Sequence, residues 1–173
     1  SKYEAGFLGA GNMGGALAAA AARQATGERV AVSCSTPAHS AAAAERLGCR
    51  AAAPEEILRE SRFVFLGVKP QMLDGVAQSL SAPIAASESV FVSMLAGVQL
   101  ERLERTLGAD KKIIRILPNT PCAVGQGVVL YCANARVTDD DLAAFCALMA
   151  DAGIVDPMPE QLIDAGCAIT GCG

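Results

Sequence analysis

The sequence predicts an α/β protein of the doubly wound Rossmann type, with a mostly parallel sheet. Short apolar runs rich in Val, Ile and Phe alternate with stretches of helical length, and Gly, Pro, Ser or Asn separates them. A glycine-rich turn directly follows the first apolar run. The length of 173 residues corresponds to one domain, or to one domain plus the beginning of another.

Eight segments have the composition of buried strands. Most of them contain β-branched or aromatic residues, and turn-forming residues bound them. In chain order the expected strands are residues 5–9, 29–34, 50–52, 63–68, 89–93, 112–117, 128–133 and 154–156. Because helices are expected in most of the gaps, successive strand-helix-strand units predict parallel pairing.

The helix after the second expected strand has clear start and end signals. Thr36 is expected to be its N-cap, and Pro37 occupies the first helical position. The helix then runs through residues 41–47 and ends before Gly48.

A helix near the end of the chain has similar signals. Thr138 and Asp141 form a capping pair, because each side chain can bind the other residue's backbone N–H. We expect the helix over residues 142–152, with Gly153 just past its end.

The first expected strand leads from Leu8 into Gly9-Ala10-Gly11-Asn12-Met13-Gly14, which matches G-x-G-x-x-G and precedes a long helix. Gly9 permits the tight turn, Gly11 lets a pyrophosphate approach the backbone, and Gly14 lets helix and strand pack closely. The helix N-terminus presents unpaired N–H groups to the phosphates. Residues 8–14 therefore predict a dinucleotide-binding site, with a purely structural turn as the alternative.

The end of the second expected strand indicates which dinucleotide binds. An NAD-selective site places an Asp or Glu there for the ribose 2′-hydroxyl, but residues 29–44 contain neither. Ser35 and Thr36 instead offer hydroxyls beside a helix N-terminus, which suit a 2′-phosphate. NADP (NADPH) is therefore favoured over NAD, although no Arg lies next to these hydroxyls. For His39, the only histidine, a surface position is expected, with 2′-phosphate contact or catalysis as alternatives.

Composition excludes several classes of partner. Fourteen Lys and Arg against 18 Asp and Glu give a net charge of −4, so no positive field favours nucleic acid or an anionic membrane. No apolar run approaches ~18 residues, so no membrane span or secretory signal is predicted. The seven cysteines form no C-x-x-C pair, so we expect free thiols, no metal site and a cytoplasmic location.

Three further segments, in this order and spacing, closely resemble the pyrroline-5-carboxylate reductase family. They are Phe-Leu-Gly-Val-Lys-Pro-Gln-Met at 65–72, Ser-Met-Leu-Ala-Gly-Val at 93–98 and Arg-Ile-Leu-Pro-Asn-Thr-Pro at 115–121. The resemblance covers the whole chain and implies NADPH-dependent reduction of the imine of 1-pyrroline-5-carboxylate to L-proline, in proline biosynthesis. Each segment follows an expected strand, so all three should line one cleft at the carboxyl edge of the sheet.

The resemblance also assigns cofactor-binding residues. It places Gly67, Val68, Lys69 and Pro70 on the adenosine and ribose side, Met94, Leu95, Ala96 and Gly97 along the nicotinamide ribose, and Asn119 at the nicotinamide end. A solvated loop lysine is the alternative for Lys69, and a turn former is the alternative for Asn119. Leu95 and Pro54 depart from the usual family pattern. No catalytic residue is assigned, because the expected role of the protein is alignment of cofactor and imine.

The resemblance further implies a domain organisation. Residues 1–160 are expected to form the NADP-binding domain, and residues 161–173 are expected to begin a helical linker. The linker would lead into a C-terminal domain that contains the substrate pocket and forms the homo-oligomer. The chain is expected to stop before that domain and to be inactive alone. Two alternatives remain open. One is a β-hydroxyacid dehydrogenase-like oxidoreductase, whose D-x-P-V-S-G type substrate loop this chain lacks near Cys122, and the other is a non-catalytic NADP-binding module.

Overall fold

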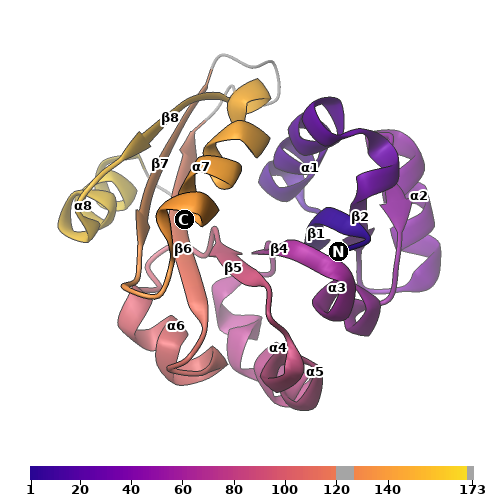
Figure 1. The fold of residues 1–173 in the computed structure, drawn as a ribbon, viewed down its shortest axis with the longest axis horizontal. Helices are drawn as coiled ribbons and strands as arrows, with labels where there is room; N and C mark the ends of the chain where they lie inside the picture. The colour runs from indigo at the N-terminus through magenta and orange to yellow at the C-terminus, as the bar shows by residue number, and fades with distance from the viewer. Residues whose placement is uncertain (120–126, 171–173) are drawn as a thin grey trace.

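The computed structural model describes residues 1–119 and 127–170, with side chains for residues 1–118 and 127–165. Eight strands of the described residues form one sheet (Figure 1). They are β1 (Tyr3–Leu8), β2 (Val30–Ser33), β3 (Arg50–Ala51), β4 (Ser61–Leu66), β5 (Val90–Ser93), β6 (Lys112–Asn119), β7 (Gly127–Ala133) and β8 (Gly153–Pro157). Their order across the sheet is β3-β2-β1-β4-β5-β6-β7-β8.

The sheet is parallel except at one pair of strands. All neighbours from β3 to β6 are parallel, β6 and β7 are antiparallel, and β7 and β8 are parallel. The strand order reverses at β1, since β2 and β3 lie on one side of it and β4 to β6 on the other. This order confirms the predicted doubly wound Rossmann-type fold.

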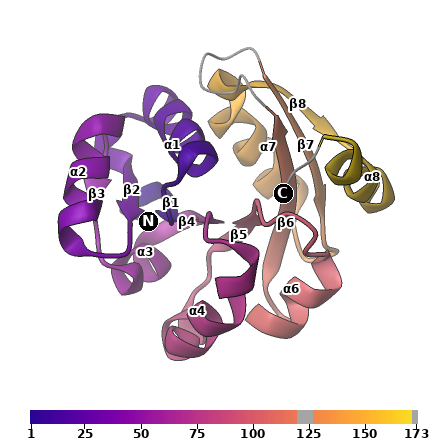
Figure 2. The ribbon, with the colours of Figure 1, turned by 180° about the vertical axis from the view of Figure 1, so that it is seen from behind.

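Helices cover both faces of the sheet (Figures 1 and 2). They are α1 (Asn12–Ala25), α2 (Pro37–Leu47), α3 (Pro54–Glu60), α4 (Leu73–Ser79), α5 (Ser81–Ala86), α6 (Leu100–Leu107), α7 (Asp139–Leu148) and α8 (Glu160–Thr170). One apolar core joins α1, α2 and α7 to the sheet, around the stacked rings of Phe7 and Phe65, whose centroids are 4.3 Å apart. A second core, around Phe91, joins α3 to α6 to the opposite face. Because both faces are buried, most residues of β1, β4 and β5 are apolar.

The expected strands are all present, and each end lies within two residues of its expected position. The signals of α2 are also confirmed. The Thr36 hydroxyl accepts a hydrogen bond from the His39 backbone N–H at 3.1 Å, and Pro37 is the first helical residue. Gly48 ends the helix in the left-handed conformation, with φ of 71°, which a residue with a side chain rarely adopts.

The expected bounds of α7 were wrong, although its cap was correct. Thr138 and Asp141 form a reciprocal capping box, with N–O distances of 3.1 and 3.0 Å. Because Asp141 is the third helical residue, the helix begins at Asp139 rather than at residue 142. It ends at Leu148 and continues as a short 3₁₀ helix, Ala150–Ala152, which packs against α1.

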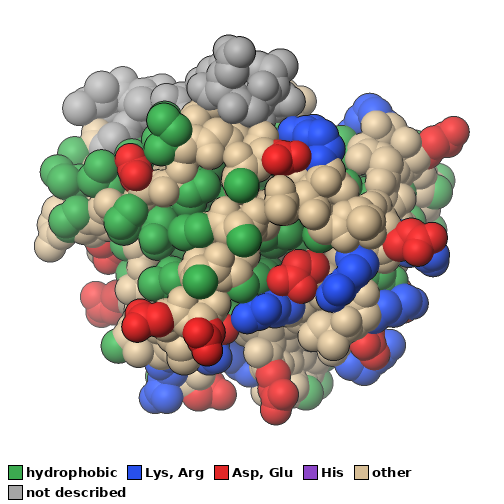
Figure 3. Space-filling view, turned by 45° about the horizontal axis from the view of Figure 1, so that its top comes forward, with side chains coloured by type: hydrophobic (Ala, Val, Ile, Leu, Met, Phe, Trp, Pro, Cys, Tyr) green, Lys and Arg blue, Asp and Glu red, His purple; other side chains and the backbone are tan. Residues whose placement is uncertain are grey.

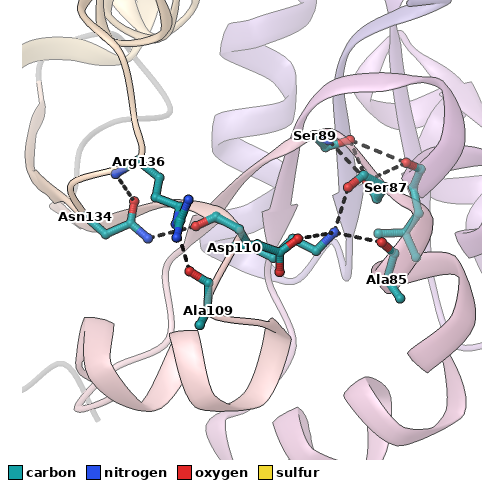
Figure 4. A network of polar contacts seen from close by, with 9 residues as sticks. Ala85, Ser87, Ser89, Ala109, Asp110, Asn134 and Arg136 are labelled. Atoms are coloured by element: carbon teal, nitrogen blue, oxygen red, sulfur yellow. Dashed lines mark hydrogen bonds and ion pairs between the residues drawn. The ribbon is translucent and has the colours of Figure 1, made fainter.

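A polar network closes the amino-terminal edge of the sheet (Figure 4). The Lys111 side chain, just before β6, is almost fully buried and donates to the carbonyl oxygens of Ala85 at 3.0 Å and Ser87 at 2.8 Å. The hydroxyl of Ser89, just before β5, donates to the Ser61 carbonyl oxygen at 2.6 Å. These bonds satisfy polar groups where α5 ends and where strands begin, so this edge has a structural role.

Charged side chains of both signs are interspersed on the face shown in Figure 3. Hydrophobic side chains gather on the left of that view, the side on which Figure 1 places β7, β8 and α8. Exposed apolar residues of these elements are Ile154 on β8 and Leu162 on α8. Within the described part of the chain, no helix is both long and apolar enough to cross a bilayer.

Candidate dinucleotide-binding site

A groove of about 400 Å³ lies at the carboxyl ends of β1, β2 and β4. Its lining residues are Leu8, Gly9, Ala10, Gly11, Ser33, Cys34, Ser35, Pro54, Gly67, Val68, Lys69, Met72, Val76, Ser79 and Leu80. A second hollow of about 400 Å³ continues past Ser33, Cys34 and Ser35 to Thr36 and Ser40. Because the strand order reverses between β1 and β4, the groove occupies the position where open α/β sheets bind ligands.

Two glycines bring the ends of β1 and β4 together. Gly9 has a φ of +94°, and its backbone N–H donates to the Ser33 carbonyl oxygen at 2.8 Å. The Gly67 N–H donates to the Leu8 carbonyl oxygen at 2.8 Å. A Cβ on Gly9 would lie 2.8 Å from the Gly67 carbonyl group, and a Cβ on Gly67 would lie 2.7 Å from the Gly9 oxygen. Both positions therefore require glycine. The predicted glycine turn at residues 8–14 and the predicted segment 65–72 meet here.

The N-terminus of α1 is open toward the groove. Gly11 is the N-cap, no side chain caps the helix, and the first turn contains no acidic residue. A Cβ on Gly11 would have no other atom within 4 Å. By contrast, a Cβ on Gly14 would lie 3.0 Å from the Gly9 carbonyl oxygen, as expected for close packing of helix and strand. Free N–H groups at a helix N-terminus, with open space before them, form an anion-binding geometry.

The hydroxyls that follow β2 lie at the N-terminus of α2. Ser35 and Thr36 are exposed, and the Ser35 hydroxyl lies 3.1 Å from Nδ1 of His39. His39 is exposed, as expected. The Ser40 hydroxyl donates to the Thr36 carbonyl oxygen at 3.1 Å and accepts from the Cys34 N–H at 2.8 Å, which fixes the turn. Ser35 and Thr36 are thus held as exposed residues at the rim of the second hollow.

The loop after β5 approaches the glycine turn. The sulfur of Met94 lies 3.9 Å from the Cβ position of Gly14. Leu95 is buried in the second core, and its N–H donates to the Ser93 hydroxyl at 3.2 Å. Gly97 has a φ of +73° and is exposed. The structure therefore brings Met94 next to the glycine turn, whereas the side chain of Leu95 points into the core.

The other predicted site residues lie around the groove or outside the described part. Asn12 is exposed at the start of α1, Met13 packs on the first core, and Pro70 begins a short 3₁₀ helix after Lys69. Asn119 is the last residue of β6, and its side chain is outside the described residues. The segment from Thr120 to residue 126 is also outside them.

A buried ion cluster that was not predicted from the sequence lies midway along β6. Arg115 is only 1% exposed, and its Nη1 lies 3.1 Å from Oε2 of Glu160 and 2.7 Å from Oδ1 of Asp164, both on α8. Burial lowers the pKa of Arg115, but the hydrogen bonds to Asp164 and Glu160 raise it by more, so the pKa lies above its ordinary value. Burial raises the pKa of Asp164, while Arg115 and Gln99 lower it more, so the carboxylate is favoured. An arginine in a strand of the sheet, with two acidic residues four apart in a later helix, was the available signal.

Four described cysteines are free and half-buried: Cys34, Cys49, Cys132 and Cys146. Burial raises the pKa of Cys49 and of Cys132 to about 11, so both thiols are protonated at neutral pH. Cys122 and Cys172, and the side chain of Cys167, lie outside the described residues. Among the residues with described placement, no group of three His, Cys, Asp or Glu could hold a metal ion.

Residues 4–97 match the model of a family described as NADP oxidoreductase, coenzyme F420-dependent. Pyrroline-5-carboxylate reductase 3 of Macaca fascicularis is 30% identical over 170 residues, which are 97% of this chain and 62% of that protein. Pyrroline-5-carboxylate reductase of Escherichia coli is 32% identical over 169 residues, or 96% of this chain and 62% of that protein.

Solved structures agree. The Plasmodium falciparum pyrroline carboxylate reductase with NADP bound superposes with a TM-score of 0.83 at 27% identity, over 99% of this chain and 63% of that one. The Streptococcus pyogenes 1-pyrroline-5-carboxylate reductase gives 0.84 at 26% identity, over 95% and 61%. The chain therefore belongs to the family described as NADP oxidoreductase, coenzyme F420-dependent, and its predicted resemblance to the pyrroline-5-carboxylate reductase family is confirmed.

Proposed function

We propose that this chain supplies the NADPH-binding part of a pyrroline-5-carboxylate reductase, which reduces the imine of 1-pyrroline-5-carboxylate to L-proline. The observation that carries the proposal is similarity over 97% of the chain to a curated reductase of this name. The chain spans 62% of the length of that relative, so the activity of the whole protein is part of the proposal. NADPH would supply the hydride, and the residues of this chain would bind and orient it.

The lining of the groove supports NADPH over NADH. Among the described residues that line the groove and the adjoining hollow, Lys69 has the only charged side chain. Ser35 and Thr36 occupy the place where an NAD-selective site has a carboxylate. A 2′-phosphate would therefore meet hydroxyls and a helix N-terminus without repulsion from an acidic group.

The proposed path of the cofactor follows the carboxyl edge of the sheet. The pyrophosphate would lie at Gly9–Gly14 and the adenosine side between Ser35 and residues 67–70. The nicotinamide ribose would extend along Met94–Gly97 toward Asn119. This direction follows the strand order, because β2 lies on one side of the reversal point and β5 and β6 on the other.

The proposal also divides the protein into parts. Residues 1–160 would form the cofactor domain, and residues 161–173 would begin the connection to the part that longer relatives possess. That further part would enclose the imine and form a homo-oligomer, in the cytoplasm.

Cofactor titration tests the proposal directly. NADPH and NADH are titrated into the chain at one ionic strength, with nicotinamide fluorescence as the signal. We expect NADPH to bind more tightly, because only NADPH uses the hydroxyls after β2. Equal affinities, or tighter NADH, would remove the argument from the 2′-phosphate.

An assay with the imine tests whether this chain contains the cofactor site but not the substrate site. NADPH oxidation with 1-pyrroline-5-carboxylate is followed for residues 1–173 and for the E. coli relative at equal concentration. Loss of about 4 kcal/mol of positioning lowers a rate about a thousandfold, so turnover by the chain alone should be negligible. A comparable rate would place the substrate site within these residues.

A further inference from the structure

Three segments that are distant in sequence meet at the buried guanidinium of Arg115. Arg115 belongs to β6, and its two carboxylate partners, Glu160 and Asp164, belong to α8. Oε2 of Glu160 also accepts the backbone N–H of Leu100 at 2.7 Å. The side-chain amide of Gln99 donates to Oδ2 of Asp164 at 2.9 Å. The carboxylates of α8 therefore tie β6 to the first residues of α6.

This cluster lies at the point where the loop after β5 ends. Gln99 is the N-cap of α6 and ends the loop that contains Met94–Gly97. The other end of that loop is fixed where the Met94 N–H donates to the Leu66 carbonyl oxygen at 3.4 Å. Arg115 precedes Asn119 by four residues in the same strand. In the sheet, Arg115 lies beside Ser93, the last residue of β5, so the cluster adds a second connection, between β6 and the start of α6.

We propose that Arg115, through Glu160 and Asp164, is a positioning residue for the nicotinamide half of the cofactor. The inference rests on the proposed function, because it needs NADPH in the groove. Arg115 acts through the two carboxylates, which hold the start of α6 beside β6 and so fix the end of the loop Met94–Gly97. The adenosine half, bound at β1 and β2, is independent of this cluster.

The burial pattern makes the proposal testable without unfolding the protein. Arg115 is 1% exposed, whereas the side chains of Glu160 and Asp164 are 28% and 34% exposed. Removing the arginine leaves two carboxylates that water can reach. Removing both carboxylates would leave a buried cation, which is far more destabilising. Arg115→Met is therefore the variant of choice, since Met fills part of the same volume without charge.

The experiment compares NADPH with a ligand that lacks the whole nicotinamide half. NADPH and adenosine 2′,5′-bisphosphate are titrated into the wild type and Arg115→Met by calorimetry, after circular dichroism has shown a folded chain. We expect the dissociation constant for NADPH to rise at least tenfold, and that for adenosine 2′,5′-bisphosphate to stay within twofold. Arg115→Lys keeps one cationic contact and should recover most of the NADPH affinity.

Two further variants control for general destabilisation. Arg102→Met makes the same substitution on α6 at an exposed pair, 3.5 Å from Asp74, and should change neither affinity. Glu160→Ala removes one α8 carboxylate from the cluster and should reproduce the effect of Arg115→Met on NADPH affinity. It therefore tests the proposal even if Arg115→Met does not fold.

Equal weakening of both ligands, or of neither, in the folded Arg115→Met or Glu160→Ala variant would overturn the inference and leave NADPH binding standing. A wild type that binds both ligands equally well would also overturn it, because the loop after β5 would then not hold the nicotinamide half. A wild type that binds neither ligand would contradict the proposed function itself.

Discussion

Replacing Gly11 by Val should remove cofactor binding while leaving the fold intact. Gly11 is the N-cap of α1, with φ of −68° and ψ of −167°, an extended conformation that Val adopts readily. No atom lies within 4 Å of the Cβ position. The free protein therefore has space for the side chain, and that space is where the proposed pyrophosphate would lie.

The two effects differ in size. Exchange of the N-cap from Gly to Val, with no packing clash, should cost less than about 1 kcal/mol of folding free energy. Exclusion of the pyrophosphate removes at least two hydrogen bonds to a charged group, at about 1.5 to 3 kcal/mol each. At about 1.4 kcal/mol per factor of ten, the NADPH dissociation constant should rise a hundredfold or more.

Thermal unfolding by circular dichroism and an NADPH titration on the same sample measure both effects. Gly75→Val serves as a matched control, because Gly75 is also exposed with no atom within 4 Å of its Cβ position, but it lies on α4 and does not line the groove. The control should bind NADPH normally. Wild-type NADPH affinity in Gly11→Val would refute the reasoning, since the phosphates would then lie elsewhere.

Three further results are expected. Ser35→Ala should weaken NADPH binding by about 1 to 3 kcal/mol and leave NADH binding unchanged. Thr36→Ala should have the same effect on binding and should also lower the melting temperature, because Thr36 caps α2. An equal loss of affinity for both cofactors would contradict a 2′-phosphate contact. Gly67→Ala should destabilise the fold by about 1 to 3 kcal/mol in a urea titration, since its Cβ would lie 2.7 Å from the Gly9 oxygen, and an unchanged midpoint would refute the close approach. Burial raises the pKa of Asp141, but hydrogen bonds from Thr138 and Lys112 lower it by more, so the pKa lies below its ordinary value of 3.8. The ionised carboxylate therefore stabilises the fold above that value, and this stabilisation is lost as the pH falls through the folded pKa. Asp141→Asn should flatten the fall in melting temperature below about pH 4.

Features encoded within a few adjacent residues could be predicted from the sequence. The glycine turn, the Thr36 cap and the Gly48 end of α2 depend on backbone geometry that particular residues favour, and they lie where expected. The central strands were recognisable because burial on both faces makes most of their residues apolar. The exact ends of α7 were not, because the 3₁₀ turn at Ala150–Ala152 depends on its packing against α1.

Features that depend on contacts between distant segments could not be predicted. By contrast, the antiparallel pairing of β6 with β7 had an available signal, because only seven residues separate these strands, too few for the crossover that parallel strands need. Arg115 was read only as part of a family segment, because its partners are 45 and 49 residues away on α8. The buried side chain of Leu95 likewise follows from the packing of α6 beneath the loop, not from the loop's own sequence.

The buried Lys111 network at the amino-terminal edge has a consequence for protein engineering. Its hydrogen bonds connect α5, β5 and β6 at the edge opposite the groove, so substitutions in the cofactor loops leave them untouched. Effects of distant, unconnected sites on stability usually add. An exposed loop position such as Ser35 can therefore be varied in a library to change nucleotide preference, while Lys111, Ser87 and Ser89 are kept constant to preserve the scaffold.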